Sequence, residues 1–139
     1  MPSSACKVKP AEHAGTVSLV EGISNSTFLL GVTLDDVSAL HFLPGQYVSL
    51  NVPGTSQSRA YSFSTAPGSK EARFLIRNVP GGLMSGWLSR EAAIGQRMSF
   101  VGPSGSFFLR PVERPILMLA GGTGLAPLLS MLEVLANRG

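Results

Sequence analysis

The sequence predicts an all-β domain, built as a closed or nearly closed barrel, followed by the opening elements of an α/β unit. Three observations support this fold class: many short apolar segments, frequent turn residues between them, and a change of pattern near residue 114. The chain of 139 residues contains 16 Gly and 10 Pro, enough to supply those turns. We therefore divide it into a linker or tail (1–14), a barrel (15–113) and the start of a second domain (114–139).

Six segments have the composition of strands. Each is short, rich in β-branched or aromatic residues and bounded by turn-forming residues; they comprise residues 16–20, 27–32, 46–52, 59–64, 73–77 and 97–101. Residues 84–93 differ, because Trp87, Leu88 and Ala92 recur at helical spacing and Ser85 is a candidate N-cap. The barrel is therefore expected to contain one short helix.

The last part of the chain has a different pattern. Residues 116–120 form a continuous apolar run, which is typical of a buried parallel strand. A glycine-rich turn follows, and residues 125–137 predict an apolar helix with Pro127 in its first turn. Because one strand and one helix cannot bury both faces of that strand, we expect the chain to stop just inside a truncated α/β domain.

Composition and charge exclude several classes of function. The net charge is only +3 and no block of Lys or Arg occurs, so we expect no nucleic-acid partner. Charged residues make up 14%, against about a quarter in ordinary domains, which suggests that a ligand or another domain covers part of the surface. The sequence has no apolar run of membrane-span length and no signal-peptide core, so we expect no membrane partner and a cytoplasmic location.

The sequence offers no metal-binding pattern. Cys6 is the only cysteine, so this chain cannot form an internal disulfide or hold an iron–sulfur cluster on four thiolates. We interpret Cys6 as a free thiol in the N-terminal tail. His13 and His41 lack the spacing of metal ligands.

The first candidate site is the cluster Arg59, Ala60, Tyr61 and Ser62 on a predicted strand. Arg59 and Tyr61 would project to the same side of that strand. The planar guanidinium of Arg59 suits a phosphate, the ring of Tyr61 can stack on a ring system, and the Ser62 hydroxyl can approach a ring nitrogen. Taken alone, such a cluster is more often only an exposed Arg beside a packed Tyr.

Two glycine-rich clusters are further candidates. The first opens the predicted helix and contains Gly82, Leu83, Met84 and Ser85. A helix N-terminus presents free N–H groups that suit a phosphate, although a simple turn with an N-cap would look the same. The second joins the apolar run to the last helix and contains Gly121, Gly122, Thr123, Gly124, Ala126 and Pro127. Such a turn commonly holds a dinucleotide, yet Pro127 stands where the usual fingerprint has its last Gly, so a tight β-α turn remains the alternative.

The three clusters, in this order and spacing, resemble the three signatures of the ferredoxin–NADP reductase superfamily. Residues 44–47 and 102–107 match two further segments of that family, and the resemblance covers about residues 15–139. Residues 77–81 and the tail 2–7 bring the chain closest to the reductases of benzoate, toluate and anthranilate dioxygenases.

The resemblance implies a fold and a set of cofactor-binding residues. The fold would be a six-stranded antiparallel Greek-key FAD-binding barrel with one short helix, followed by the first β-α unit of a nicotinamide-nucleotide domain. Arg59 would hold the FAD pyrophosphate, Tyr61 would stack on the isoalloxazine, and Ser62 would bond near its reactive nitrogen. The remaining FAD contacts would come from Ala60, Ile76, Arg77, Gly82, Leu83, Met84, Ser85 and Thr123. The neighbours of Thr123 in the 121–127 turn would form part of an NADH site.

The resemblance also implies an oxidoreductase. In the intact family, electrons pass from NADH through FAD to a 2Fe–2S centre and on to an aromatic-ring dioxygenase, and no side chain acts as a catalytic acid or base. The ferredoxin domain and most of the NADH domain are expected to be missing from this chain, which reads as a fragment. The alternatives are the reductase part of a flavohaemoglobin or a phenol hydroxylase, and a flavin-binding module that is inactive in isolation. The sequence leaves NADH and NADPH undecided.

Overall fold

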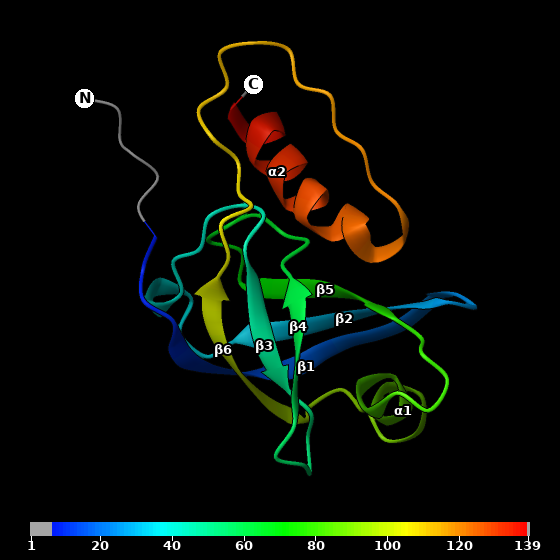
Figure 1. Ribbon diagram of the computed structural model, residues 1–139. Coiled ribbons are helices and arrows are strands. Elements are labelled where there is room, and N and C mark those ends of the chain that lie inside the picture. Colours follow the sequence, from blue (N-terminus) through cyan, green and yellow to red (C-terminus); the bar gives the residue numbers. More distant parts are fainter. Residues whose placement is uncertain (1–6, 139) are drawn as a thin grey trace.

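The chain folds into a six-stranded antiparallel barrel, as predicted. The computed structural model describes residues 7–138, which are drawn in colour in Figure 1. The strands are β1 (Ala11–Ser24), β2 (Thr27–Leu34), β3 (Tyr47–Asn51), β4 (Ser58–Ser62), β5 (Glu71–Arg77) and β6 (Arg97–Ser104). The helices are α1 (Leu83–Arg90) and α2 (Leu125–Arg138), with single 3₁₀ turns η1 (Val37–Ala39) and η2 (Gly122–Gly124).

The strand order places β4 and β5 at the two ends of the sheet. The order is β4-β3-β6-β1-β2-β5, and every pairing is antiparallel. β6 returns to lie between β1 and β3, which is the crossover of a Greek key. This order matters for the site described below, because β4 and β5 each keep one edge outside the sheet pairing.

The alternation of side chains along the strands builds the core. In β5, Ala72, Phe74 and Ile76 point inward and are buried, whereas Arg73 and Arg77 are exposed. The fully buried apolar side chains are Val17, Leu30, Val32, Val48, Leu50, Phe63, Phe74, Ile76 and Phe100. Among them, Phe63 stacks on the ring of Phe42, and the two ring centroids are 3.8 Å apart.

The N-terminal boundary of the barrel differs from the prediction. β1 begins at Ala11, so residues 11–14, which we assigned to a linker or tail, belong to the barrel. They pair with β6 in a register that sets Ala11 opposite Gly102 and Ala14 opposite Ser99. The sequence does not predict this extension, because these residues lack the apolar alternation of a half-buried strand. They form a strand through their backbone pairing with β6. The predicted free thiol Cys6 lies outside the described residues.

The predicted strand 116–120 is a second correction. These residues are irregular, and the side chains of Leu117 and Leu119 are each 83% exposed. A parallel strand needs neighbouring strands for its hydrogen bonds and for cover on both faces, and residues 7–138 offer it none. Residues 116–120 instead belong to the long loop after β6 that arches over α2 (Figure 1), and residues 107–119 of this loop line a groove of about 780 Å³ with Leu128 and Met131 of α2. The helix predicted over 125–137 is confirmed as α2.

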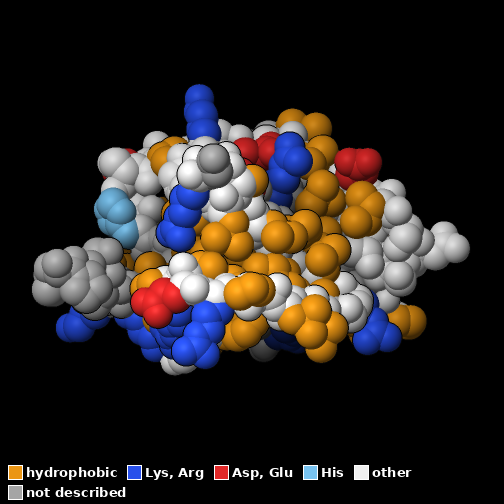
Figure 2. Space-filling model, turned by 90° about the horizontal axis from the view of Figure 1, so that it is seen from above, with side chains coloured by type: hydrophobic (Ala, Val, Ile, Leu, Met, Phe, Trp, Pro, Cys, Tyr) orange, Lys and Arg blue, Asp and Glu red, His pale blue; other side chains and the backbone are white. Residues whose placement is uncertain are grey.

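The face that carries α2 and the 107–119 segment is strongly apolar. Figure 2 shows apolar side chains gathered across the middle of this face. Exposed large apolar residues here are Phe107, Val112, Ile116, Leu117, Leu119, Leu125 and Leu132. Neither helix of the described chain is long and apolar enough to cross a membrane. Within residues 7–138, no group of three or more His, Cys, Asp or Glu side chains could hold a metal ion.

Candidate functional site

The candidate site begins with the gap between the two outermost strands. β4 and β5 are joined through residues 63–70 and are tied near that turn, where the Ser64 N–H and the Ser64 hydroxyl both donate to the Arg73 carbonyl at 2.9 Å. Beyond this tie, no strand of the described chain pairs with the outer edge of β4 or of β5. We call the strip between these two edges the seam. Its backbone N–H and C=O groups are available to a ligand.

The predicted β4 residues lie along one side of the seam. Arg59 and Ala60 are exposed, while Tyr61 and Ser62 are half-buried. Pairing with β3 fixes this arrangement, since Tyr61 stands opposite Val48. Burial raises the pKa of the Tyr61 hydroxyl, and the positive charge of Arg59 acts in the opposite direction. Arg59 and Tyr61 are two residues apart on β4, so their side chains project to the same side of the strand.

The predicted β5 residues have unequal access to the seam. Arg77 is exposed at the end of β5. Ile76 is fully buried in the core, so its side chain cannot line a ligand and only its backbone is available. Residues 78–82 then lead directly into α1, whose first turn therefore lies near this end of β5 (Figure 1).

The start of α1 is an open N-terminus. Within the described chain, the backbone N–H groups of Leu83, Met84 and Ser85 have no hydrogen-bond acceptor, and the first helical bond is donated by the Gly86 N–H to the Gly82 carbonyl at 2.9 Å. Three free N–H groups at the positive end of a helix suit a phosphate. The start of α1 and the charge of Arg59 are thus two features of the candidate site that suit an anion.

Ser85 is not the N-cap that the sequence suggested. The cap is Gly82, and the Ser85 hydroxyl instead donates to the Val79 carbonyl at 2.8 Å and accepts from the Val79 N–H at 3.1 Å. This bond holds the turn before the helix closed. It also explains the glycine, because a Cβ at position 82 would lie 2.7 Å from the Ser85 hydroxyl oxygen and 2.9 Å from the Val79 carbonyl oxygen.

The third predicted cluster lies beside the seam. η2 contacts β5 although the two are far apart in sequence. Gly122 adopts a φ of +57°, which favours glycine, and a Cβ at Gly121 or Gly124 would meet nothing within 4 Å. Thr123 and Pro127 are half-buried, whereas Ala126 is buried against the barrel. The turn thus presents an open backbone surface, as a nucleotide would require.

Sequence reasoning missed the contacts that fix this arrangement. Gln46 is buried, and its side chain is hydrogen-bonded to the Leu43 N–H and to the Gly105 carbonyl. The side chains of Ser130 and Glu133 in α2 are hydrogen-bonded to the backbone of residues 65 and 66. A signal for the second pair was present, since Ser130 and Glu133 are polar residues at i and i+3 of an otherwise apolar helix. Gln46 carries no comparable signal.

The geometry suits a ligand with a flat ring and a phosphate group. Comparison with known proteins agrees, because the model of the oxidoreductase FAD-binding domain matches residues 14–109. This chain belongs to the oxidoreductase FAD-binding domain family. The predicted resemblance to ferredoxin reductases is thereby confirmed, and the six-stranded barrel is the fold of this family.

Two curated members of the family are similar along nearly the whole chain. The 2-halobenzoate 1,2-dioxygenase electron transfer component of Burkholderia cepacia is 52% identical over 97% of this chain and 40% of its own length. The toluate 1,2-dioxygenase electron transfer component of Pseudomonas putida is 49% identical over 99% of this chain and 41% of its own. The chain therefore spans about two-fifths of the length of these two relatives.

A solved structure is similar to this chain over most of its length. A cytochrome P450 reductase from Amycolatopsis is 35% identical, with a TM-score of 0.84 over 93% of this chain and 40% of that one. The agreement includes most of the region after residue 109, where the FAD-binding domain model ends.

Proposed function

We propose that this chain binds FAD in the seam and forms the FAD-binding part of an NADH-dependent reductase. The observation that carries the proposal is the combination of Arg59 and Tyr61 on the open edge of β4 with the uncapped start of α1 after β5. Bound FAD would supply hydride acceptance and one-electron release. The protein supplies position and electrostatics.

Each group of residues has a separate task in this proposal. Arg59 and the free N–H groups of α1 bind the pyrophosphate, because both offer positive charge and donors to phosphate oxygens. Tyr61 stacks on the isoalloxazine and Ser62 bonds near its reactive nitrogen. Ile76 contributes its backbone only, since its side chain is buried in the core. Arg77 and Thr123 contact the outer parts of the ring system.

The larger reductase is the second level of the proposal. The similar proteins are named as electron transfer components of dioxygenases, and this chain spans about two-fifths of their length. We infer that electrons pass from NADH through FAD to a 2Fe–2S ferredoxin domain and then to a terminal oxygenase in the cytoplasm. The exposed apolar residues 116–120 and the open turn 121–127 support a second, nucleotide-binding domain that begins at about residue 114.

The same segment supports a second candidate function for the chain alone. Residues 116–120 have no strand partner within the described chain. A chain in this state would hold the flavin without turnover and would act as a binding module.

Titration of the flavin-free chain with FAD, FMN and riboflavin tests flavin binding. We expect FAD to bind more tightly than FMN, and riboflavin to bind most weakly, because riboflavin leaves Arg59 and the start of α1 without a phosphate. The readouts are quenching of flavin fluorescence and a shift of its visible absorption. Equal affinity for all three flavins would refute the phosphate assignment, and an unchanged spectrum at excess protein would refute flavin binding.

A further inference from the structure

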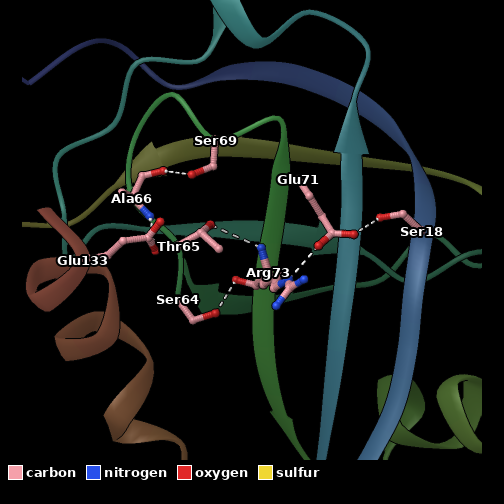
Figure 3. Close-up of polar contacts among 8 residues, drawn as sticks. All are labelled: Ser18, Ser64, Thr65, Ala66, Ser69, Glu71, Arg73 and Glu133. Atoms are coloured by element: carbon pink, nitrogen blue, oxygen red, sulfur yellow. Dashed lines mark hydrogen bonds and ion pairs between the residues drawn. The ribbon is translucent and has the colours of Figure 1, made fainter. Parts of the chain in front are cut away.

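Helix α2 holds the turn that joins β4 to β5. The Ser130 hydroxyl donates to the Thr65 carbonyl at 2.7 Å, and the Ala66 N–H donates to the Glu133 carboxylate at 3.1 Å. Ser130 is fully buried and Ala66 is 6% exposed, whereas Glu133 is at an exposed position, so the Ser130 bond is the better shielded of the two. Figure 3 shows Glu133 reaching from α2 to this turn. We call these two hydrogen bonds the α2 latch.

The turn held by the latch is also where β5 is tied to the residues after β4. We call this tie, between Ser64 and Arg73, the hinge. Ser64 precedes Thr65 directly, and its N–H and hydroxyl both donate to the Arg73 carbonyl. The Arg73 N–H in turn donates to the Thr65 hydroxyl at 3.4 Å. Among the described residues this is where the outer edges of β4 and β5 are hydrogen-bonded, so the position of residues 64–66 sets how far the seam opens.

The two sides of the hinge are anchored to different parts of the molecule. On the β5 side, Arg73 donates from Nε to Glu71 at 2.6 Å, and Glu71 accepts from the Ser18 hydroxyl at 2.5 Å (Figure 3). This chain of bonds ties β5 to β1 on the outer face of the barrel, because Glu71 and Arg73 alternate with the inward-pointing Ala72 and Phe74. On the β4 side, α2 holds residues 65 and 66, and the Phe63 N–H donates to the Gln46 carbonyl at 3.2 Å. A displacement of α2 would therefore act directly on the β4 side of the hinge.

We propose that Ser130 and Glu133 are positioning residues that set the width of the seam by holding Thr65 and Ala66. The inference rests on the proposed function and deepens it, because the seam is the proposed flavin site. This coupling would connect α2, whose first residues belong to the proposed nicotinamide turn 121–127, to the strand that contains Tyr61 and Ser62. Neither Ser130 nor Glu133 needs to touch the flavin for this coupling.

Four variants of this chain test the latch. Ser130→Ala and Glu133→Ala each remove one hydrogen bond, whereas Glu133→Gln keeps a carbonyl acceptor for the Ala66 N–H. Asn137→Ala, at an exposed position of the same helix, is the matched control. The Val17 amide, which donates to the Gln96 carbonyl at 2.8 Å in the barrel, reports whether a variant still folds.

The first measurement is amide hydrogen exchange of the flavin-free chain. In both alanine variants we expect the Ser64 and Ala66 amides to exchange about tenfold faster, with Val17 unchanged. Glu133→Gln and Asn137→Ala should stay within about twofold of the wild type. Faster exchange at Ala66 with unchanged exchange at Ser64 would overturn the inference, because the latch would then hold only the turn.

The second measurement is the dissociation constant for FAD. Both alanine variants should bind FAD about three- to tenfold more weakly, and Glu133→Gln should restore most of the affinity. Equal affinity in all variants would overturn the coupling to the flavin. If the wild-type chain took up no FAD, the proposed function would fail. The exchange rate of the Ser64 amide in the variants would then decide whether α2 controls the hinge. Glu133 is at an exposed position, so Glu133→Ala tests the inference even if Ser130→Ala does not fold.

Discussion

The Gln46 side chain donates a hydrogen bond to the Gly105 carbonyl at 3.0 Å and accepts one from the Leu43 N–H at 2.9 Å. Gln46 is 1% exposed, and both bonds are partly buried. The bond to Leu43 closes the turn before β3, and the bond to Gly105 joins this turn to the loop after β6, which is far away in sequence. This relationship fixes the turn from which β3, the partner strand of β4, begins.

Replacing Gln46 by Leu should therefore destabilise the barrel. The substitution leaves the half-buried Leu43 N–H and Gly105 carbonyl without these partners, and we expect a loss of about 1–3 kcal/mol in the free energy of unfolding. Urea unfolding of the variant measures the change. Gln57→Ala, at an exposed position, should shift stability by no more than about 0.5 kcal/mol. A similar loss in both variants would contradict the role given to Gln46.

Replacing Arg59 by Ala should weaken FAD binding without unfolding the chain. Arg59 is exposed, so its removal costs little stability, but it takes away a charge-assisted bond to phosphate. We expect a loss of about 1.5–3 kcal/mol in binding free energy, measured by titration of the flavin-free chain. Arg114→Ala, at an exposed position outside the barrel, is the control and should bind FAD as the wild type does. The same affinity in Arg59→Ala and wild type would show that Arg59 does not contact the phosphate.

Replacing Gly82 by Ala should disturb the start of α1. The new Cβ would lie 2.7 Å from the Ser85 hydroxyl oxygen, which must move and release the Val79 backbone. We expect FAD affinity to fall by about tenfold, because the free N–H groups of the first turn are displaced. Gly22→Ala is the matched control, since a Cβ there meets nothing within 4 Å. An unchanged affinity in Gly82→Ala would remove this turn from the proposed phosphate site.

The stability of the barrel should depend on pH through Glu71. A hydrogen bond from Ser18, and then Arg73, lower the pKa of Glu71 from its ordinary value of 4.5. Because the folded pKa is below the unfolded one, this stabilisation is present above pH 4.5 and is lost as the pH falls through the folded pKa. Glu71→Gln should flatten the acid side of the profile of unfolding free energy against pH. Asp35, whose pKa is lowered by Arg97, contributes an acid-side slope to both proteins, so the difference between the two profiles isolates Glu71.

The features that the sequence predicted are those set by local pattern. The short apolar run within residues 73–77 predicted a strand, and the structure confirms it as β5. The spacing of Trp87 and Leu88 likewise predicted a helix that is confirmed as α1. In both cases the local pattern of apolar residues is enough, because burial of one face decides the structure.

The features that the sequence missed depend on distant partners. Residues 11–14 are a strand because β6 lies beside them, and residues 116–120 are irregular because no strand of the described chain does. The Ser85 hydroxyl looked like a cap, yet it reaches back to Val79. Of the candidate site, the residue types on β4 and at the start of α1 could be predicted. The seam could not, because it exists only once the strand order is known.

The last prediction is that this chain alone, loaded with FAD, oxidises NADH far more slowly than an intact reductase. Hydride transfer requires the reacting atoms to be held about 3–3.5 Å apart in a fixed orientation. In the proposed function the 121–124 turn would provide one wall for a nicotinamide, and within the described chain no strand lies beside residues 116–120 to position the loops of another. A nucleotide site in a parallel sheet is built from the loops of several strands. The measurement is anaerobic stopped-flow mixing with NADH, with dithionite as a control that the bound flavin can be reduced. Bleaching of the flavin by NADH at the rate of an intact reductase would show that one wall is sufficient.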